Sequence, residues 1–143
     1  MNDPSAVRPE QFAALVRDAS DEQLEAGFRE NREVLLEEIF SRMPQQFDPE
    51  RAAGVEAVIE WQITRPSGEP DRWQLAIRDG TCTLTRGGTA KPDVSLRVAP
   101  VDFVKLITGV DAGPKMFVFG RLRIRGNVML AARMQGWFRM PSA

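Results

Sequence analysis

Apolar and polar residues alternate strictly in five short segments, and this pattern constrains the fold more than any other feature of the chain. In VEAVIEWQIT (55–64), apolar side chains occupy every second position from Val55 to Ile63. Successive side chains of a β-strand point to opposite faces, so such a segment forms a strand with one packed and one solvated face. The same period recurs at 73–79, 81–85, 94–98 and 120–127. A parallel sheet covered on both faces would need continuous apolar runs, so we predict an α+β fold with all helices on one face of the sheet.

Helical periodicity precedes the strands. Residues 9–19 carry apolar side chains at i, i+3, i+4 and i+7, and SDEQ (20–23) has the form of a capping box that opens a second helix. We expect Pro44 to end this second helix, because the residue before a proline is disfavoured in helical geometry. The apolar stripe of this helix comprises Leu24, Phe28, Leu35, Ile39 and Met43, widened by Val34, Leu36 and Phe40.

Three further helical segments are expected in the last third of the chain. PVDFVKLIT (100–108) has one apolar stripe and Gly109 as a C-cap. A short helical turn follows, for which Asp111 is the candidate N-cap. Asn127 is the expected N-cap of the last helix, whose inward side chains are Leu130, Ala131, Met134, Trp137 and Phe138.

The length of 143 residues corresponds to one domain, so we predict a single domain over 1–143, with 1–20 as an N-terminal extension that contains the short first helix. The polar start, MNDPSAVRPE, lacks the apolar core of a signal peptide, and no segment approaches the roughly 18 apolar residues of a membrane span. Cys82 is the single cysteine, which excludes an internal disulfide and fits a reducing compartment. We therefore expect a cytoplasmic protein.

The chain contains no histidine and no tyrosine. The commonest general base near neutral pH and the commonest transition-metal ligand are therefore missing, and a Ser-His-Asp or Cys-His arrangement within one chain is excluded. We expect no enzymatic activity, no cofactor and no metal site. The remaining candidates for catalysis are carboxylates such as Glu56, Glu60 and Asp102. They are better explained as side chains on the solvent-exposed face of a strand and in the first turn of a helix. Cys82 is inward by alternation and is expected to be an inert buried thiol.

Charge is unevenly distributed along the chain. Residues 1–50 hold 12 acids and 5 bases (net −7), whereas 51–143 hold 8 acids and 14 bases (net +6). Either the two portions pack together or keep solvated faces, or the basic portion contacts an anionic head group, a membrane surface or an acidic partner. The overall net charge of −1 argues against a nucleic-acid partner. The alternating Arg121, Arg123 and Arg125 are expected to form the solvated face of the last strand, with head-group contact as the alternative.

Four large apolar residues follow one another from Met116 to Phe119 in KMFVFG (115–120). A segment this short is not a stable helix by itself, and no regular geometry turns all four side chains to one side. The segment is therefore either a buried connector that touches the core on two sides or a wall of an apolar cavity.

The segment PKMFVFGRLRIRGNVMLAARMQGWF (114–138) resembles the closing portion of the sterol carrier protein type-2 family. That family runs an apolar turn into a glycine, a basic–Leu–basic–Ile strand, a second glycine and a final helix. The matching positions here are Gly120, Leu122, Ile124, Gly126, Asn127, Leu130, Ala131 and Gln135. The similarity extends more loosely back to about residue 21. Arginines stand beside the Leu–Ile pair where lysines are more usual, and the lack of a peroxisomal signal favours a stand-alone bacterial member.

The resemblance implies a five-stranded, mostly antiparallel sheet with helices packed on one face, enclosing an elongated apolar tunnel. It also implies non-catalytic binding and transfer of an apolar lipid, such as a sterol, a fatty acid or an acyl-CoA. We expect the inward side chains of the strands and of the C-terminal cover to line the tunnel. These are Trp61, Ile63, Trp73, Leu75, Leu96, Phe103, Leu106, Ile107, Met116, Phe117, Phe119, Leu122, Ile124, Met134, Trp137 and Phe138.

A second function stays open, in which the chain is an accessory module that presents a lipid or prenyl-lipid intermediate to a partner enzyme. The expected ligand is a lipid or another elongated apolar small molecule. Transient contact with a membrane surface, an enzyme partner and a homodimer are the further partners that the sequence allows.

Overall fold

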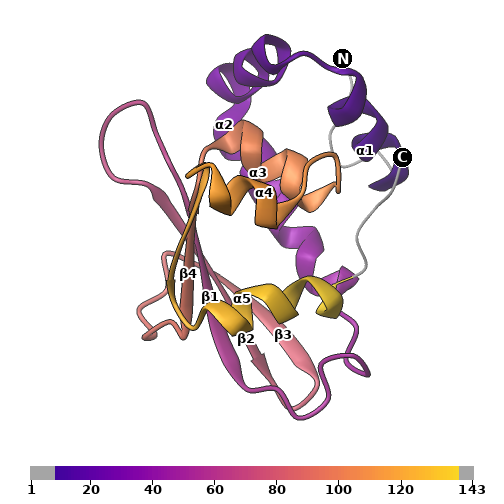
Figure 1. The fold of residues 1–143 in the computed structure, drawn as a ribbon, viewed down its shortest axis with the longest axis vertical. Coiled ribbons are helices and arrows are strands. Elements are labelled where there is room, and N and C mark those ends of the chain that lie inside the picture. Colours follow the sequence, from indigo (N-terminus) through magenta and orange to yellow (C-terminus); the bar gives the residue numbers. More distant parts are fainter. Residues whose placement is uncertain (1–8, 139–143) are drawn as a thin grey trace.

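The computed structural model describes residues 9–138, which form a five-stranded sheet and a layer of helices against one of its faces (Figure 1). The strands are β1 (Ala57–Ile63), β2 (Asp71–Arg78), β3 (Thr81–Arg86), β4 (Val94–Val98) and β5 (Leu122–Gly126). Their order across the sheet is β3-β2-β1-β4-β5. The central β1 and β4 are parallel, and the other neighbouring pairs are antiparallel. The predicted α+β class and the mostly antiparallel sheet are confirmed.

The helices begin close to the predicted caps. They are α1 (Pro9–Asp18), α2 (Asp21–Gln46), α3 (Pro100–Ile107), α4 (Gly113–Val118), α5 (Val128–Met134) and the short 3-10 helix η2 (Gln135–Trp137). The capping box of α2 is complete, because the Gln23 amide N–H donates to Ser20 Oγ at 3.1 Å and the Ser20 amide N–H donates to Gln23 Oε1 at 2.8 Å. At the start of α5, Asn127 Oδ1 accepts from the Leu130 amide N–H at 3.0 Å.

The end of α2 differs from the prediction. The helix continues through Pro44 to Gln46, and the Phe47 amide N–H donates to the Pro44 carbonyl as the helix ends. A proline inside a helix removes one backbone hydrogen bond. Here Phe40 and Met43 are buried in the turn that contains Pro44, so packing against the core holds this turn in place.

Two other local features also depart from the prediction. Asn31 interrupts α2 with φ −135° and ψ 33°, which kinks the helix. The N-cap of α4 is Ala112 rather than Asp111, whose carboxylate instead forms an ion pair with Arg121 at 3.0 Å. The Asp111 carboxylate lies at the start of α4, where it accepts from the Ala112 amide N–H at 2.9 Å, but it does not cap the helix.

Turn geometry fixes the register of the sheet at two places. Asp79 and Gly80 both have positive φ, 53° and 73°, as the predicted two-residue hairpin between β2 and β3 requires. At the end of β5, Gly126 has φ 94°, and a Cβ there would lie 2.5 Å from the Asp93 carbonyl oxygen. Only glycine allows the backbones of β5 and the start of β4 to approach so closely.

The acidic and basic portions of the chain pack together. Glu33 of α2 forms an ion pair with Arg86 of β3 at 3.2 Å, and Asp21 pairs with Lys105 of α3. The first of the alternatives drawn from the charge distribution is therefore observed.

Candidate functional site

The inner face of the sheet provides half of a closely packed apolar layer. Its central strands contribute Trp61 and Ile63 from β1, Trp73 and Leu75 from β2, and Leu96 from β4, each at most 3% exposed. Trp61 lies opposite Trp73 in the β1–β2 register and beside Leu96 in the β1–β4 register. The alternation read from the sequence thus identified side chains that share the helical side of the sheet.

Four aromatic rings form the centre of this layer. Phe40 of α2 stacks on Trp73 with ring centroids 4.7 Å apart and on Phe103 of α3 at 5.0 Å. Phe103 also makes an edge contact with Trp61 at 5.1 Å. Phe40 was not among the expected tunnel residues, although its place on the apolar stripe of α2 was the signal that could have identified it.

The C-terminal helices supply the other half of the layer. Leu106, Met116, Met134 and Trp137 are buried, and so is Leu122 of β5. Ile107, Ile124 and Phe138 are partly buried and pack against the layer. Phe117 and Phe119 lie outside it, with 47% and 70% of their surface exposed, because the short α4 turns only Met116 toward the sheet.

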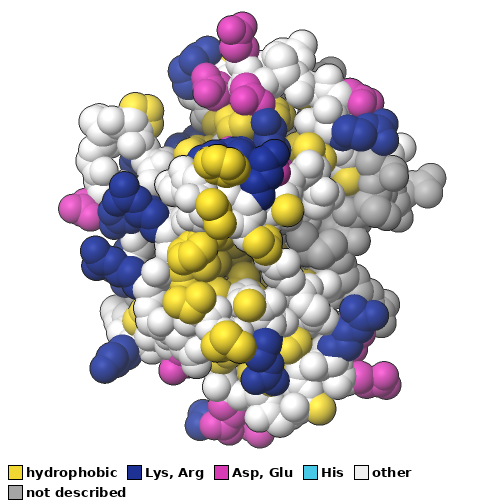
Figure 2. All heavy atoms as spheres, in the orientation of Figure 1, with side chains coloured by type: hydrophobic (Ala, Val, Ile, Leu, Met, Phe, Trp, Pro, Cys, Tyr) yellow, Lys and Arg dark blue, Asp and Glu magenta, His cyan; other side chains and the backbone are white. Residues whose placement is uncertain are grey.

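Exposed apolar side chains border this layer on α4 and α5. Phe117, Val118 and Phe119 at the end of α4, and Val128 and Met129 at the start of α5, are 47–77% exposed. Figure 2 shows hydrophobic side chains around a hollow in the surface, in the region where Figure 1 draws α4 and α5. We call these five residues the apolar rim. Exposed apolar patches of this kind mark ligand or interaction sites on many proteins.

Two polar atoms inside the layer have no hydrogen-bond partner among residues 9–138. They are the indole Nε1–H groups of Trp61 and Trp73, which are both buried. A buried donor without an acceptor costs about 1–3 kcal/mol, so a native structure that keeps two of them calls for an explanation. They belong to directly opposed residues of β1 and β2.

Arg121 holds together the segments around the apolar rim. Its guanidinium bonds to Asp102 of α3 at 2.5 Å and to Asp111 in the loop between α3 and α4 at 3.0 Å. The hydrogen bond to Asp102, assisted by both carboxylate charges, raises the pKa of Arg121 above its ordinary value despite partial burial. Burial alone would raise the pKa of Asp111, but the Ala112 amide and the Arg121 guanidinium outweigh it and lower the pKa. Arg121 was predicted to lie on the solvated face of the last strand, but it is only partly exposed and is ion-paired. Arg123 and Arg125 are exposed, as predicted.

The carboxylates considered for catalysis lie apart from one another. Glu60 is on the outer face of the sheet, where a wet side chain was predicted, but is only 4% exposed because Gln62, Arg72 and Gln74 surround it. Burial acts to raise the pKa of Glu60, yet hydrogen bonds from Gln62 and Gln74 and the Arg72 charge bring it below the ordinary value. Burial raises the pKa of the Cys82 thiol to about 11, so this thiol is protonated at neutral pH.

Residues 9–138 contain neither a cluster of metal ligands nor a membrane-spanning helix. In this part of the chain, no group of three or more Cys, Asp and Glu side chains could hold a metal ion. None of the described helices combines the length and the apolar character needed to cross a membrane.

Most of the chain matches one known protein family. The model of the SCP-2 sterol transfer family matches residues 36–139. The chain belongs to the SCP-2 sterol transfer family. The resemblance read from residues 114–138 is therefore confirmed. Lipid binding and transfer are the general function of this family.

Individual relatives agree with this assignment. The oleate-induced peroxisomal protein POX18 of Candida maltosa is 32% identical over 111 residues, which cover 76% of this chain and 87% of that protein. The peroxisomal multifunctional enzyme type 2 of Mus musculus is 31% identical over 80 residues, which cover 55% of this chain but only 11% of that enzyme. The crystal structure of Sterol Carrier Protein 2 Like 2 from Aedes aegypti has a TM-score of 0.59 and 23% identity, covering 76% of this chain and 97% of that one. The structural likeness supports the fold.

Proposed function

We propose that this member of the SCP-2 sterol transfer family binds one elongated apolar lipid between its sheet and its helices and transfers it without chemical change. The observation that carries the proposal is the apolar layer, in which two unpaired indole donors lie among aromatic and aliphatic side chains. The apolar rim on α4 and α5 lies in the region of a hollow in the surface (Figure 2), and we propose it as the route by which the lipid enters this layer. The tunnel stays a prediction, in which the bound lipid opens the closely packed layer.

The unpaired indole donors favour a lipid with a hydrogen-bond acceptor. A hydroxyl or a carboxylate would satisfy Trp61 or Trp73, whereas a pure hydrocarbon would leave both donors unmet. Sterols and fatty acids both carry such a group on a largely apolar body, as does an acyl chain attached through a thioester carbonyl. The name of the family points to sterols, and the name of a relative from Yarrowia lipolytica, fatty acid-binding protein, points to fatty acids.

Apolar burial supplies enough free energy for useful affinity. At about 0.8 kcal/mol per buried methylene, a sixteen-carbon chain gains on the order of 12 kcal/mol. Loss of translational freedom and the opening of the packed layer offset several kcal/mol of this gain. We therefore expect dissociation constants between roughly micromolar and nanomolar for palmitate or cholesterol.

The proposal is tested by displacement of a fluorescent fatty acid, with the emission of the three tryptophans as the readout. Saturable quenching that unlabelled palmitate or cholesterol reverses is the expected result. Native mass spectrometry of the purified protein should also detect one bound lipid per chain, with its mass unchanged after long incubation. A protein that carries no lipid and shows no saturable quenching would contradict the proposal.

Two conservative variants test the role of the indole donors. Trp61→Phe and Trp73→Phe keep an aromatic ring in the layer but remove the N–H group. A lost hydrogen bond of about 1 kcal/mol corresponds to roughly fivefold weaker binding of the acceptor-bearing lipid. If both variants bind palmitate and cholesterol as tightly as the unmodified chain, the indoles do not contact the polar group of the lipid.

A second candidate is an accessory module that presents its lipid to a partner enzyme. This candidate rests on the match to a short part of a peroxisomal multifunctional enzyme, in which a related segment is part of an enzyme. Affinity capture from the native host, with the chain loaded with lipid and emptied of it, tests this candidate. An enzyme captured only by the loaded chain supports it, and capture of no enzyme in either state refutes it.

A further inference from the structure

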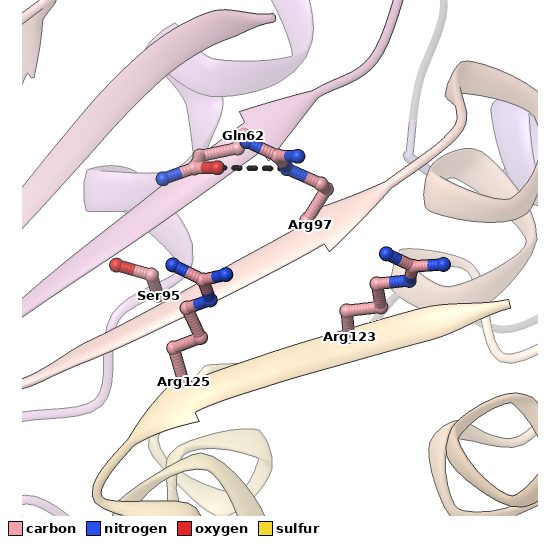
Figure 3. Close-up of a pocket in the computed structure, with 5 residues that line it drawn as sticks. All are labelled: Gln62, Ser95, Arg97, Arg123 and Arg125. Atoms are coloured by element: carbon pink, nitrogen blue, oxygen red, sulfur yellow. Dashed lines mark hydrogen bonds between the residues drawn. The ribbon is translucent and has the colours of Figure 1, made fainter. Parts of the chain in front are cut away.

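The outer face of the sheet, opposite the apolar layer, carries a cationic pocket on β4 and β5. Its five lining residues are Gln62, Ser95, Arg97, Arg123 and Arg125, and its volume is about 90 Å³ (Figure 3). The strand register brings them together, because Arg97 is opposite Arg123 and Ser95 is opposite Arg125. Gln62 is the neighbour of Arg97 on β1. A pocket of this volume has room for a group the size of phosphate.

The three arginines of this pocket have no acidic partner among residues 9–138, in contrast to most other basic residues of that range. The one buried carboxylate nearby, Glu60, already accepts hydrogen bonds from Arg72, from two glutamine amides and from the Ser95 hydroxyl at 3.4 Å. Arg97 and Arg123 are like charges at directly opposed positions of an antiparallel pair, an arrangement that destabilises a sheet. Figure 3 shows all three guanidinium groups on the same face of these strands. An anion in the pocket would relieve this repulsion.

A chain of hydrogen bonds orients one side of the pocket. The Gln62 amide donates through Nε2 to Glu60 Oε2 at 2.7 Å, and its Oε1 accepts from Arg97 Nε at 3.0 Å. Because Arg97 is held through Nε, its two terminal amino groups remain available to a ligand. Glu60 therefore acts as a buried anchor that positions Gln62, and Gln62 positions Arg97. Pre-organised donors lose less conformational freedom when a ligand binds.

We propose that this pocket binds a phosphate group, held by the guanidinium groups of Arg97, Arg123 and Arg125. Guanidinium groups suit tetrahedral oxyanions because their planar fork of N–H donors can bond two oxygens at once. Three positive charges match a phosphate monoester, whose charge lies between −1.5 and −2 near neutral pH. The phosphate belongs either to the head group of an anionic phospholipid or to a soluble phosphate ester. The pocket is separate from the apolar layer, since Leu96, Leu122 and Ile124 of the same strands point to the other face.

The first experiment titrates inorganic phosphate into the purified full-length chain at physiological salt, observed by calorimetry and by the NMR signals of Ser95 and Arg97. Saturable binding is the expected result. Arg97→Gln, Arg123→Gln and Arg125→Gln should each weaken binding about tenfold or more, as expected for loss of hydrogen bonds to a charged group. Arg29→Gln is the matched control, because it removes one exposed positive charge on α2 and should change the affinity less than twofold.

A second experiment distinguishes the two sources of phosphate. The chain is mixed with phosphatidylcholine vesicles that contain or lack phosphatidic acid, and separately with glycerol phosphate. Binding to the acidic vesicles that Arg123→Gln abolishes and Arg29→Gln preserves identifies a lipid head group. Binding of glycerol phosphate without such vesicle binding identifies a soluble ester.

Thermal unfolding separates loss of the site from loss of the fold. In phosphate-free buffer, Arg123→Gln should melt at the same temperature as the unmodified chain or higher, because it removes the repulsion with Arg97. Phosphate should raise the melting temperature of the unmodified chain and of Arg29→Gln, but not that of Arg123→Gln. The proposal is overturned if phosphate shows no saturable binding, or if the pocket variants and Arg29→Gln lose affinity equally.

Discussion

Replacement of Glu60 by glutamine tests how the outer face of the sheet is held together. The carboxylate accepts from Arg72 Nε at 3.2 Å and Gln74 Nε2 at 3.1 Å through Oε1, and from Gln62 Nε2 at 2.7 Å through Oε2. If the amino group of the new glutamine took the place of Oε1, it would face the N–H donors of Arg72 and Gln74. On the Oε2 side it would face Gln62, and rotation of Gln62 would turn its amino group toward the Nε–H of Arg97. The Ser95 hydroxyl, which donates to Oε2 at 3.4 Å, can rotate to accept from the new amino group, but each arrangement still leaves one other donor facing a donor.

The magnitude follows from the burial of the network. Glu60 is 4% exposed, so an unmet donor beside it costs about 1–3 kcal/mol. The side chain of Arg72 is 48% exposed, so solvent screens its ion pair, which adds little. We therefore expect Glu60→Gln to lower the free energy of unfolding by about 2 kcal/mol, or the melting temperature by roughly 4–8 °C. The measurement is urea unfolding at pH 7, followed by tryptophan fluorescence.

The same variant has a characteristic pH dependence. The pKa of Glu60 in the folded chain lies below its ordinary value of 4.5, so the stabilisation of the fold by the ionised Glu60 carboxylate is fully present above pH 4.5. It is lost as the pH falls from 4.5 through the lower pKa of the folded state. The difference between Glu60→Gln and the unmodified chain should therefore shrink below pH 4.5. Glu56→Gln is the control, because the Glu56 side chain is 66% exposed and the change should stay within about 0.5 kcal/mol at every pH. Equal stability of Glu60→Gln and the unmodified chain at pH 7 would refute the reasoning.

Three further predictions concern the rest of the chain. Phe40→Ala should lower the free energy of unfolding by about 3–5 kcal/mol in denaturant titrations, because it empties the centre of the aromatic stack; a loss below about 1 kcal/mol would mean that the layer collapses around the vacancy. Val118→Ser in the apolar rim should slow lipid uptake from vesicles in stopped-flow fluorescence, whereas Val34→Ser, also exposed but on α2, should not; equal rates would exclude the rim as the route. Cys82 should resist a thiol reagent at pH 8 in the folded chain and react on unfolding, and rapid labelling of the folded chain would contradict its raised pKa.

Part of the candidate site could be predicted from the sequence because its signals are local. The period of two placed Trp61, Trp73 and Leu96 on one face, since the pleat of a strand alone decides which side chains point together. Phe117 and Phe119 could not be placed in this way. They lie in a single short helix, where only the position of that helix against the sheet decides which side chain turns inward, and Met116 took that place.

The sequence by itself determined the two-faced strands, the caps at Ser20 and Asn127 and the Asp79–Gly80 turn, because each depends on interactions within a few residues. Only the tertiary structure decided the parallel pairing of β1 with β4, the stacking of Phe40 on Trp73, the burial of Glu60 and the gathering of unpaired arginines around one pocket. These features join segments far apart along the chain, and their energies arise only when packing brings those segments into contact. Which residues can share a face is a property of the local backbone, whereas what covers that face is a property of the whole fold.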